Sequence, residues 1–265
     1  MIKKKFPDPN KVRSKMVDIL YNSSAGHLGS GMSVIEMLIA MYASTNIRDI
    51  KKQKIFRSRV IVSKGHCAAA TYSVMNAFGL ISDKLLYTYH KNNSFLAGHV
   101  SHSVPCVEHS TGALGHGLAV AAGSSFALKT KFENKKSLSL CLCGDGELQE
   151  GSIWESIMFA AHHKLDNLVV LIDYNKISSI TNTNDVINLE NLKNKFLSFN
   201  CLTKVVDGHD IKKIISTIKN NSFKKKPLVI ICKTTKGKNI PFAENKAIWH
   251  YRTLNKELYE TAKKH

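Results

Sequence analysis

Arginine is scarce in this chain, although lysine is abundant. Only five of the 38 basic residues are arginine, and the formal net charge is +18. Arginine makes the commonest specific contacts with DNA bases, and the lysines occur in short, scattered runs with no aromatic platform between them. The composition therefore argues against nucleic-acid binding and favours an acidic protein partner or an anionic substrate.

Long apolar runs and a secretory leader are also lacking. The most apolar helical stretch, residues 33–44, contains Glu36 and is too short to span a bilayer. The basic residues 1–6 are followed by no apolar core or cleavage site. We therefore expect a soluble protein that is neither secreted nor inserted in a membrane.

The cysteines form no C-x-x-C framework of the kind that marks a disulfide scaffold or a zinc site. There are six, and two of them, Cys141 and Cys143, alternate within a predicted strand. Alternate strand residues point to one face of a sheet, so these two thiols are expected to be buried together. Reduced, buried thiols are typical of a cytoplasmic protein.

Internal repeats, low-complexity tracts and linker-like changes of composition are absent, so we interpret residues 1–265 as one domain. Five apolar runs predict strands, at residues 60–63, 138–143, 168–173, 204–206 and 228–233. Helical spacing occurs at residues 10–21, 33–43, 65–78, 112–128, 153–163, 211–218 and 254–264. This alternation predicts a three-layer α/β/α fold with a mainly parallel sheet covered on both faces.

Glycines and polar residues follow three of the predicted strands. Gly65 and His66 follow the first strand, the segment 144–146 (Gly-Asp-Gly) follows the second, and Asn175 follows the third. Open parallel sheets bind ligands at the carboxyl ends of their strands, so these motifs point to one site. Asp145 taken alone is equally typical of a turn.

The combination favours a metal–diphosphate site. One carboxylate, one amide oxygen and a nearby main-chain carbonyl suit Mg²⁺, which keeps phosphate oxygens among its ligands. The glycines on both sides of Asp145 allow a sharp turn and a close approach to a ligand. A helix is predicted after Gly151, and its amino-terminal amides favour a phosphate.

Four histidines stand apart from the other eight. His27, His66 and His99 each follow a glycine in a predicted loop, and His250 lies in an irregular segment. No cysteine or carboxylate accompanies them at metal-ligand spacing, which argues against a zinc site. They suit proton transfer and hydrogen bonding to a polyhydroxylated carbonyl substrate. Other histidines, at 102, 109, 162 and 163, are interpreted as surface or core residues.

Eight motifs occur in order along nearly the whole chain. They are SAGHLGSGMS (24–33), SKGHCAAATYS (63–73), AGHV (97–100), STGALGHGLAVAAG (110–123), GDGELQEGSIWE (144–155), DYNKIS (173–178), VDGHD (206–210) and KTTKGKNIPFAEN…WH (233–250). Together they resemble the amino-terminal half of transketolase, a thiamine diphosphate (TPP) enzyme, and especially the amino-terminal subunit of split transketolases. The resemblance implies the TPP-binding fold of the diphosphate (PP) domain.

The resemblance also implies ligands for the metal and the diphosphate. Asp145, Asn175 and the carbonyl of Ile177 match the Mg²⁺ ligands, with Ca²⁺ or Mn²⁺ as possible substitutes. His66 and Gly146 match diphosphate contacts, the latter through its amide.

Further matches concern the rest of the cofactor and the substrate. The cofactor-binding set also includes Gly112 and Leu114 beside the aminopyrimidine, Gly144, Glu150 at a subunit interface, and His250 between diphosphate and substrate. His27 and His99 match imidazoles that hold the donor ketose. The catalytic set is then His27, His66, His99 and His250.

Several positions depart from the family pattern. Ala113 and His116 replace a more frequent proline and glutamine, and Tyr174 stands where many TPP enzymes have asparagine. The segment 179–181 (Ser-Ile-Thr) replaces a common Ile-Asp-Gly, which leaves the floor of the cofactor site open. Tyr251 stands where glycine is frequent and is expected to narrow substrate access.

The family's cofactor-activating glutamate belongs to a pyrimidine-binding domain that would follow the matched segment. We therefore expect a partner chain that supplies this glutamate, and a heterotetramer of two copies of each chain. The implied reaction transfers a two-carbon ketol unit from a ketose, in phosphorylated form, to an aldose. The alternatives are another TPP-dependent carboligase or 2-oxo acid decarboxylase, and a non-catalytic interaction protein.

Overall fold

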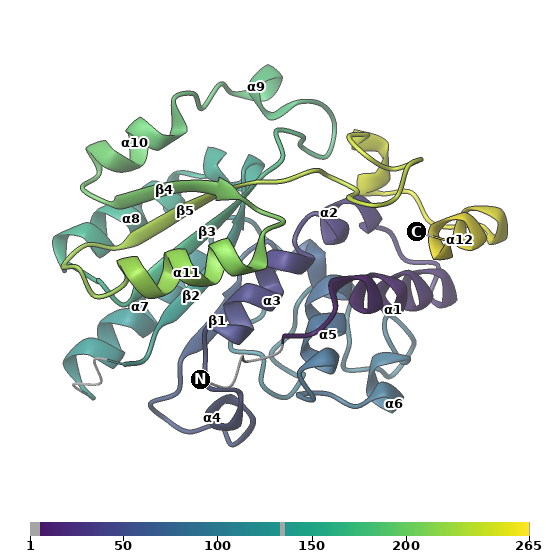
Figure 1. Cartoon of the computed structure of the whole chain (residues 1–265), viewed down its shortest axis with the longest axis horizontal. Coiled ribbons are helices and arrows are strands. Elements are labelled where there is room, and N and C mark those ends of the chain that lie inside the picture. Colours follow the sequence, from purple (N-terminus) through teal and green to yellow (C-terminus); the bar gives the residue numbers. More distant parts are fainter. Residues whose placement is uncertain (1–5, 133–135, 265) are drawn as a thin grey trace.

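A five-stranded parallel sheet forms the centre of the protein (Figure 1). The computed structural model describes residues 6–132 and 136–264. The strands follow the order β1-β2-β3-β5-β4, and every neighbouring pair is parallel. Their bounds are β1 Arg59–Val62, β2 Ser139–Gly144, β3 Leu168–Tyr174, β4 Leu202–Asp207 and β5 Leu228–Lys233. The predicted parallel sheet is confirmed, and all five predicted strands are present.

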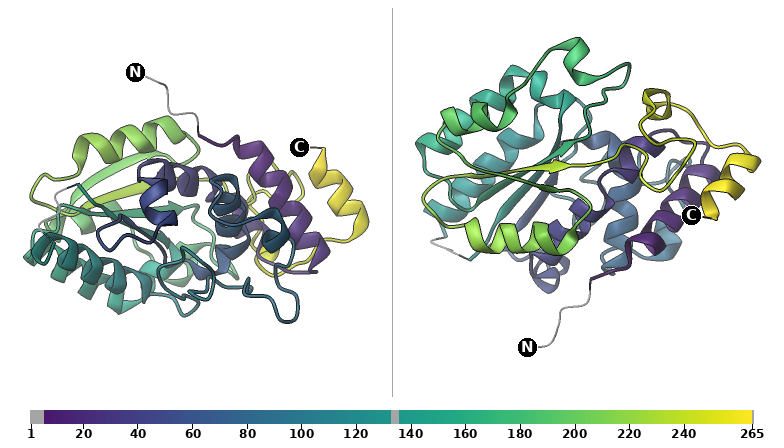
Figure 2. Two further views of the ribbon diagram at one scale, coloured as in Figure 1. Left: turned by 90° about the horizontal axis from the view of Figure 1, so that it is seen from below. Right: turned by 45° about the horizontal axis from the view of Figure 1, so that its top comes forward.

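Helices cover both faces of the sheet. One face is covered by α3 (Ile35–Ala43), α5 (Ala68–Ala77) and α11 (Ile211–Asn221), and the other by α7 (Gly117–Thr130), α8 (Gly151–His162) and α10 (Leu192–Ser198). In Figure 2, left, α11 and α7 lie on opposite sides of the strands. The arrangement confirms the predicted three-layer fold.

Strand residues alternate between two hydrophobic clusters. Leu140 and Leu142 of β2 join the cluster under α3 and α5, whereas Cys141 and Cys143 join the cluster under α7 and α8. The Sγ atoms of the two cysteines lie 3.7 Å apart, as their alternation predicted. All six cysteines are free thiols.

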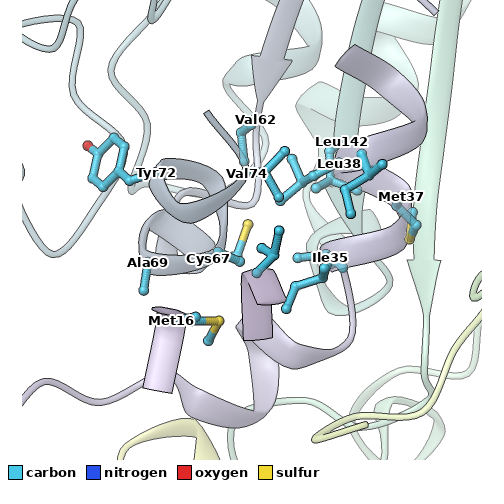
Figure 3. Packing of buried hydrophobic residues seen from close by; sticks show 14 of the residues in the cluster. Met16, Ile35, Met37, Leu38, Val62, Cys67, Ala69, Tyr72, Val74 and Leu142 are labelled. Atoms are coloured by element: carbon cyan, nitrogen blue, oxygen red, sulfur yellow. The ribbon is translucent and has the colours of Figure 1, made fainter. Parts of the chain in front are cut away.

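The packing between α3, α5 and the sheet is dense. Figure 3 shows Leu38 of α3 and Val74 of α5 close to Val62 and Leu142 of the sheet, with Ile35 of α3 below them in this view. These side chains are at most 3% exposed. The apolar stretch that seemed too short for a membrane is therefore a buried core helix. In the described residues, no helix combines the length and the apolar character that a bilayer-spanning segment requires.

Two helices from opposite ends of the chain pack together outside the sheet (Figures 1 and 2). The helix α1 (Pro9–Asn22) contacts α12 (Lys256–Lys263). The rings of Tyr21 and Tyr259 stack at 4.3 Å, and Lys263 Nζ lies 2.8 Å from Asp18 Oδ1. These contacts hold the last helix against the amino-terminal part of the protein.

The remaining elements are short. The largest error in a predicted boundary concerns the helix predicted at residues 112–128. The predicted helix 112–128 begins only at Gly117, because residues 112–116 form a loop in which Gly115 has φ +86°. The short helices are α2 (Leu28–Met32), α4 (Ile47–Lys51), α6 (Asp83–Leu86) and α9 (Thr183–Val186), with 3₁₀ turns at Gly65–Cys67, Gly146–Gln149 and Ala247–His250. Of the basic amino-terminal segment, residues 1–5 lie outside the described residues.

Candidate functional site

A cavity of 480 Å³ lies at the carboxyl edge of the sheet, where β1, β2, β3 and β5 end. Every candidate residue from the sequence lines it. These residues are His27, His66, His99, Gly112, Leu114, Gly144, Asp145, Gly146, Glu150, Asn175, Ile177 and His250. The chain brings them together from segments that are far apart in the sequence, and the parallel topology explains how.

The two polar strand ends meet through backbone contacts. Asp145 follows β2, and its Oδ1 accepts from the Gly146 amide at 2.8 Å while Oδ2 accepts from the Lys176 amide at 2.5 Å. Lys176 can aim its amide this way because it adopts the left-handed conformation, with φ +65°. Asn175 Oδ1 accepts from the amide of Ile177 at 3.0 Å. The loop after β3 is thus tied to the Gly-Asp-Gly turn.

The chemistry of this loop fits a divalent cation. Asp145 is 5% exposed, and burial, followed by repulsion from the Asp173 carboxylate, raises its pKa from 3.8 to about 6. A buried carboxylate whose charge is poorly compensated attracts a cation. The carbonyls of Ile177 and Ser178 already accept from an ammonium, Lys236 Nζ, at 3.1 and 2.6 Å. Oxygen ligands of this kind suit Mg²⁺.

Four imidazoles form a cluster beside this loop. The ring of His27 lies 5.6 Å from those of His66 and His99 and 5.1 Å from that of His250, and the His66 and His250 rings are 4.8 Å apart. Burial, reinforced by neighbouring cationic groups, lowers the pKa of His27 to about 4 and the pKa of His250 to about 3. Burial also lowers the pKa of His66 well below its usual range. These three imidazoles are therefore neutral near pH 7 and can both donate and accept hydrogen bonds.

Local backbone contacts hold the cluster together. His27 precedes α2 in the left-handed conformation, with φ +68°, and its amide donates to the carbonyl of His250 at 3.0 Å. Nδ1 of His250 hydrogen-bonds with Ser30 Oγ at 3.2 Å. A Cβ at Gly26 would lie 2.8 Å from the carbonyl oxygen of Tyr251, so only glycine allows this approach.

Lys236 and Ser30 are among the cavity residues that the sequence reasoning missed. Lys236 is only 2% exposed, and burial, together with repulsion from Lys64, lowers its pKa to about 8. Ser30 is 1% exposed and bonds His250. Both lie inside the motifs given above, and Lys236 could have been found as one of the lysines in the polar run that follows a buried strand. A buried ammonium here adds positive charge that an anionic ligand would neutralise.

A buried ion pair forms the floor of the cavity, and it too was missed. Lys64 Nζ contacts Asp173 Oδ2, and the two side chains are 5% and 0% exposed. Burial alone would raise the pKa of Asp173, but the Lys64 ammonium holds it below its usual range. The two residues are 109 positions apart and become neighbours only because β1 and β3 both flank β2.

A third buried carboxylate, Glu147, holds the loops at Gly115 and Gly144. It accepts from the amides of Gly115 at 2.9 Å and Gly144 at 3.0 Å, and from the hydroxyl of Ser63. A Cβ at Gly117 would lie 2.6 Å from Ser63, so glycine is required for α7 to start this close to β1. These contacts place the loop 112–116 against the cavity.

The rim of the cavity is apolar and exposed. Ile180 is 80% exposed, Val186 44% and Tyr251 66%, and all three line the cavity. Glu150, expected at a subunit interface, is exposed in this chain. The Tyr251 ring lies 4.7 Å from that of His250, at the mouth, where the sequence predicted narrowing. Exposed apolar side chains around a polar cavity are typical of a surface that another protein covers.

The fold and the site define an α/β protein with a cavity at the carboxyl edge of a parallel sheet, lined by both a buried carboxylate and buried ammonium groups. Residues 8–265 match the family described as transketolase, thiamine diphosphate binding domain. The chain belongs to this family, and its curated relatives include named transketolase subunits, which are transferases.

Relatives of similar length are named as separate subunits. The chain is 37% identical to one such subunit, from the apulose-4-phosphate transketolase of Phocaeicola vulgatus, over 95% of this chain and 90% of the relative. It is 30% identical to the 6-deoxy-6-sulfo-D-fructose transketolase subunit SqwG of a Clostridium species, over 96% and 92%. The predicted resemblance to the amino-terminal subunit of split transketolases is confirmed.

Longer transketolases share the same fold over part of their length. The chain superimposes on the transketolase of Campylobacter jejuni with a TM-score of 0.86 and 30% identity, and the match covers 97% of this chain and 41% of that one. It is likewise 30% identical to human transketolase, of which it spans 40%.

Proposed function

We propose that residues 1–265 act as the diphosphate-binding (PP) domain of a two-chain, TPP- and Mg²⁺-dependent transketolase. The observation that supports this most strongly is the meeting of four imidazoles with Asp145, Asn175 and the Ile177 carbonyl in one cavity. The reaction would transfer a two-carbon ketol unit from a ketose, in phosphorylated form, to an aldose. The free thiols support a reducing, cytoplasmic location.

In this proposal Asp145, Asn175 and the Ile177 carbonyl hold Mg²⁺, for which Ca²⁺ or Mn²⁺ can substitute. The diphosphate is held by the Gly146 amide, His66 and the buried ammonium of Lys236, with Gly144 giving the backbone room to approach. Gly112 and Leu114 contact the aminopyrimidine. When bound, TPP supplies the carbon nucleophile that carries the two-carbon unit.

Three of the clustered imidazoles would bind the sugar. The His99 and His250 rings both lie next to that of His27, at centroid distances of 5.6 and 5.1 Å. This spacing allows hydrogen bonds to successive hydroxyls of one ketose. A neutral imidazole can accept a proton from a hydroxyl and return it, which a protonated imidazole cannot.

A partner chain would complete the site. Support comes from the relatives named as subunits and from the exposed rim of Ile180, Val186 and Tyr251. The partner would bring the glutamate that activates the cofactor, and two copies of each chain would form a heterotetramer, with Glu150 at an interface. An acidic surface on the partner would complement the +18 charge of this chain.

The main alternative is another TPP-dependent carboligase or a 2-oxo acid decarboxylase. The four imidazoles favour a ketose, because an oxo acid offers fewer hydroxyls for them to bind. A further alternative is a non-catalytic interaction protein. Such a role would not explain why a buried Asp145 and a buried Lys236 line the same cavity.

The test is to co-purify this chain with a candidate partner chain that carries a pyrimidine-binding domain. Xylulose 5-phosphate and an aldose acceptor should be converted only when both chains, TPP and Mg²⁺ are present. Release of CO₂ from pyruvate would instead support the decarboxylase, and turnover by this chain alone would refute the shared site. A complex that fails to bind TPP with Mg²⁺ would support the non-catalytic role.

A further inference from the structure

Asp173, the residue two positions before Asn175, lies at the centre of a buried hydrogen-bond network. Its carboxylate accepts from Ser33 Oγ at 2.7 Å, from Asn175 Nδ2 at 3.0 Å, and from Lys64 Nζ and Thr234 Oγ1. These donors come from four separate parts of the chain, which are the ends of β1, β3 and β5 and the turn between α2 and α3. Asp173 is fully buried, so its geometry is fixed by these contacts.

The bond from Asn175 has a consequence for the metal loop. An asparagine side chain has a carbonyl oxygen at one end of the amide and an NH₂ group at the other, and only the oxygen can bind a cation. Because Asp173 accepts from the NH₂ end, the oxygen is turned away from Asp173 and towards the loop, where it meets the Ile177 amide. The network therefore selects the orientation of Asn175 that metal binding needs.

The main chain of Asp173 positions the other side-chain ligand. Its carbonyl accepts from the amide of Asp145 at 3.2 Å, across the pairing of β2 with β3. One residue thus contacts both Asp145 and Asn175. Lys64 links Asp173 to the segment around Ser30, because the Lys64 ammonium donates both to the Asp173 carboxylate and, at 3.2 Å, to the carbonyl of Ser30.

We propose that Asp173, held by Lys64, is a positioning residue that presents the Asn175 amide oxygen to the metal ion. This inference rests on the proposed metal site. Removing a residue that hydrogen-bonds to a metal ligand commonly lowers metal affinity by about 10–100-fold. A role limited to stability makes a different prediction, because affinity would then follow the stability of the fold.

Three variants that share Lys64→Met separate the two roles. With Asp173 retained, the buried carboxylate has lost its ammonium partner and the chain should be less stable, but the bond from Asn175 remains. With Asp173→Asn, the charge is removed and an amide oxygen is kept. With Asp173→Leu, the charge and the acceptor are both removed. Any direct effect of Lys64 on the diphosphate is common to all three.

The measurement is Mn²⁺ affinity by electron paramagnetic resonance, on the co-purified complex with saturating TPP, beside urea unfolding of this chain. We expect the variant with Asp173→Asn to be more stable than the variant that retains Asp173, because the unpaired buried charge is gone. The variant with Asp173→Leu should gain less stability, because Ser33 Oγ, Thr234 Oγ1 and Asn175 Nδ2 lose their acceptor. Only the variant with Asp173→Leu should lose Mn²⁺ affinity, by about 10–100-fold relative to the variant that retains Asp173. Equal affinities, or affinities that rise with stability, would overturn the positioning role. A wild-type complex without Mn²⁺ binding would overturn the proposed metal site, and this inference with it.

Discussion

Replacing Asp145 with asparagine should abolish the proposed binding of a metal ion and leave the stability of the ligand-free fold nearly unchanged. The rise in the pKa of Asp145 from 3.8 to about 6 means that the ionised carboxylate is about 3 kcal/mol less favourable in the ligand-free fold at pH 7. Asp145→Asn removes this penalty. The variant retains one acceptor oxygen, so one of the two amides bonded to Asp145 loses its partner, at a cost of about 1–3 kcal/mol.

The relief of the charge penalty and the loss of one amide partner nearly cancel at pH 7. Only the charge penalty depends on pH, so a comparison at two pH values separates the two effects. A raised carboxyl pKa in the fold gives stability that is complete below pH 3.8 and is lost as the pH rises through about 6. The penalty at pH 5 is then only about 1.5 kcal/mol. Relative to wild type, Asp145→Asn should therefore become about 1–1.5 kcal/mol more stable between pH 5 and pH 7.

Urea unfolding at the two pH values, with and without TPP and Mg²⁺, checks this prediction. At ligand concentrations about 100 times the dissociation constant, the wild type should gain about 2.7 kcal/mol. The variant should gain almost nothing, because it lacks the charged ligand. A variant that loses stability relative to wild type as the pH rises, or that is stabilised equally by the ligands, would refute the reasoning.

Three further predictions concern the imidazoles, the glycines and the rim. The His27 ring signals should not titrate between about pH 5.5 and 8 in NMR spectra, because the pKa of His27 is lowered from 6.5 to about 4. The fold stabilises the neutral form of His27, so this residue's contribution to stability is complete above pH 6.5 and is lost as the pH falls towards 4. In calorimetry, Gly123→Ala should stabilise α7 by about 0.5–1 kcal/mol, since nothing lies within 4 Å of the new Cβ, whereas Gly117→Ala in the same helix should destabilise it by about 1–3 kcal/mol. In pull-down titrations, Ile180→Asp should weaken binding of the partner chain at least about tenfold. The control is Ile55→Asp at another exposed isoleucine, which should leave binding unchanged. Equal effects at both positions would argue against the rim as the interface.

The sequence was sufficient to predict the sheet because each strand is a short apolar run between polar turns. The run 168–173, for example, became β3 with its first six residues fully buried. A parallel strand that is buried on both faces is apolar at nearly every position, so it can be predicted from a continuous apolar run and needs no alternation of apolar and polar residues. The motif spacing then placed each strand end, and the parallel topology brought the strand ends together.

Tertiary contacts decided what the sequence could not show. The loop 112–116 has helical spacing, yet Gly115 and Glu147 hold it in an irregular path. Lys64 and Asp173 look like ordinary polar residues at strand ends, and their pairing depends on a strand order that one sequence does not reveal. Long-range pairs of this kind determine the electrostatics of the site.

The most direct test is a crystal structure of the two-chain complex grown with TPP and Mn²⁺. An anomalous peak for manganese should lie between the Asp145 carboxylate, the Asn175 amide oxygen and the Ile177 carbonyl, with diphosphate density beside the Gly146 amide and His66. Manganese bound elsewhere, or a cavity that holds no diphosphate at saturating TPP, would contradict the assignment of this cavity as the diphosphate half of a shared site.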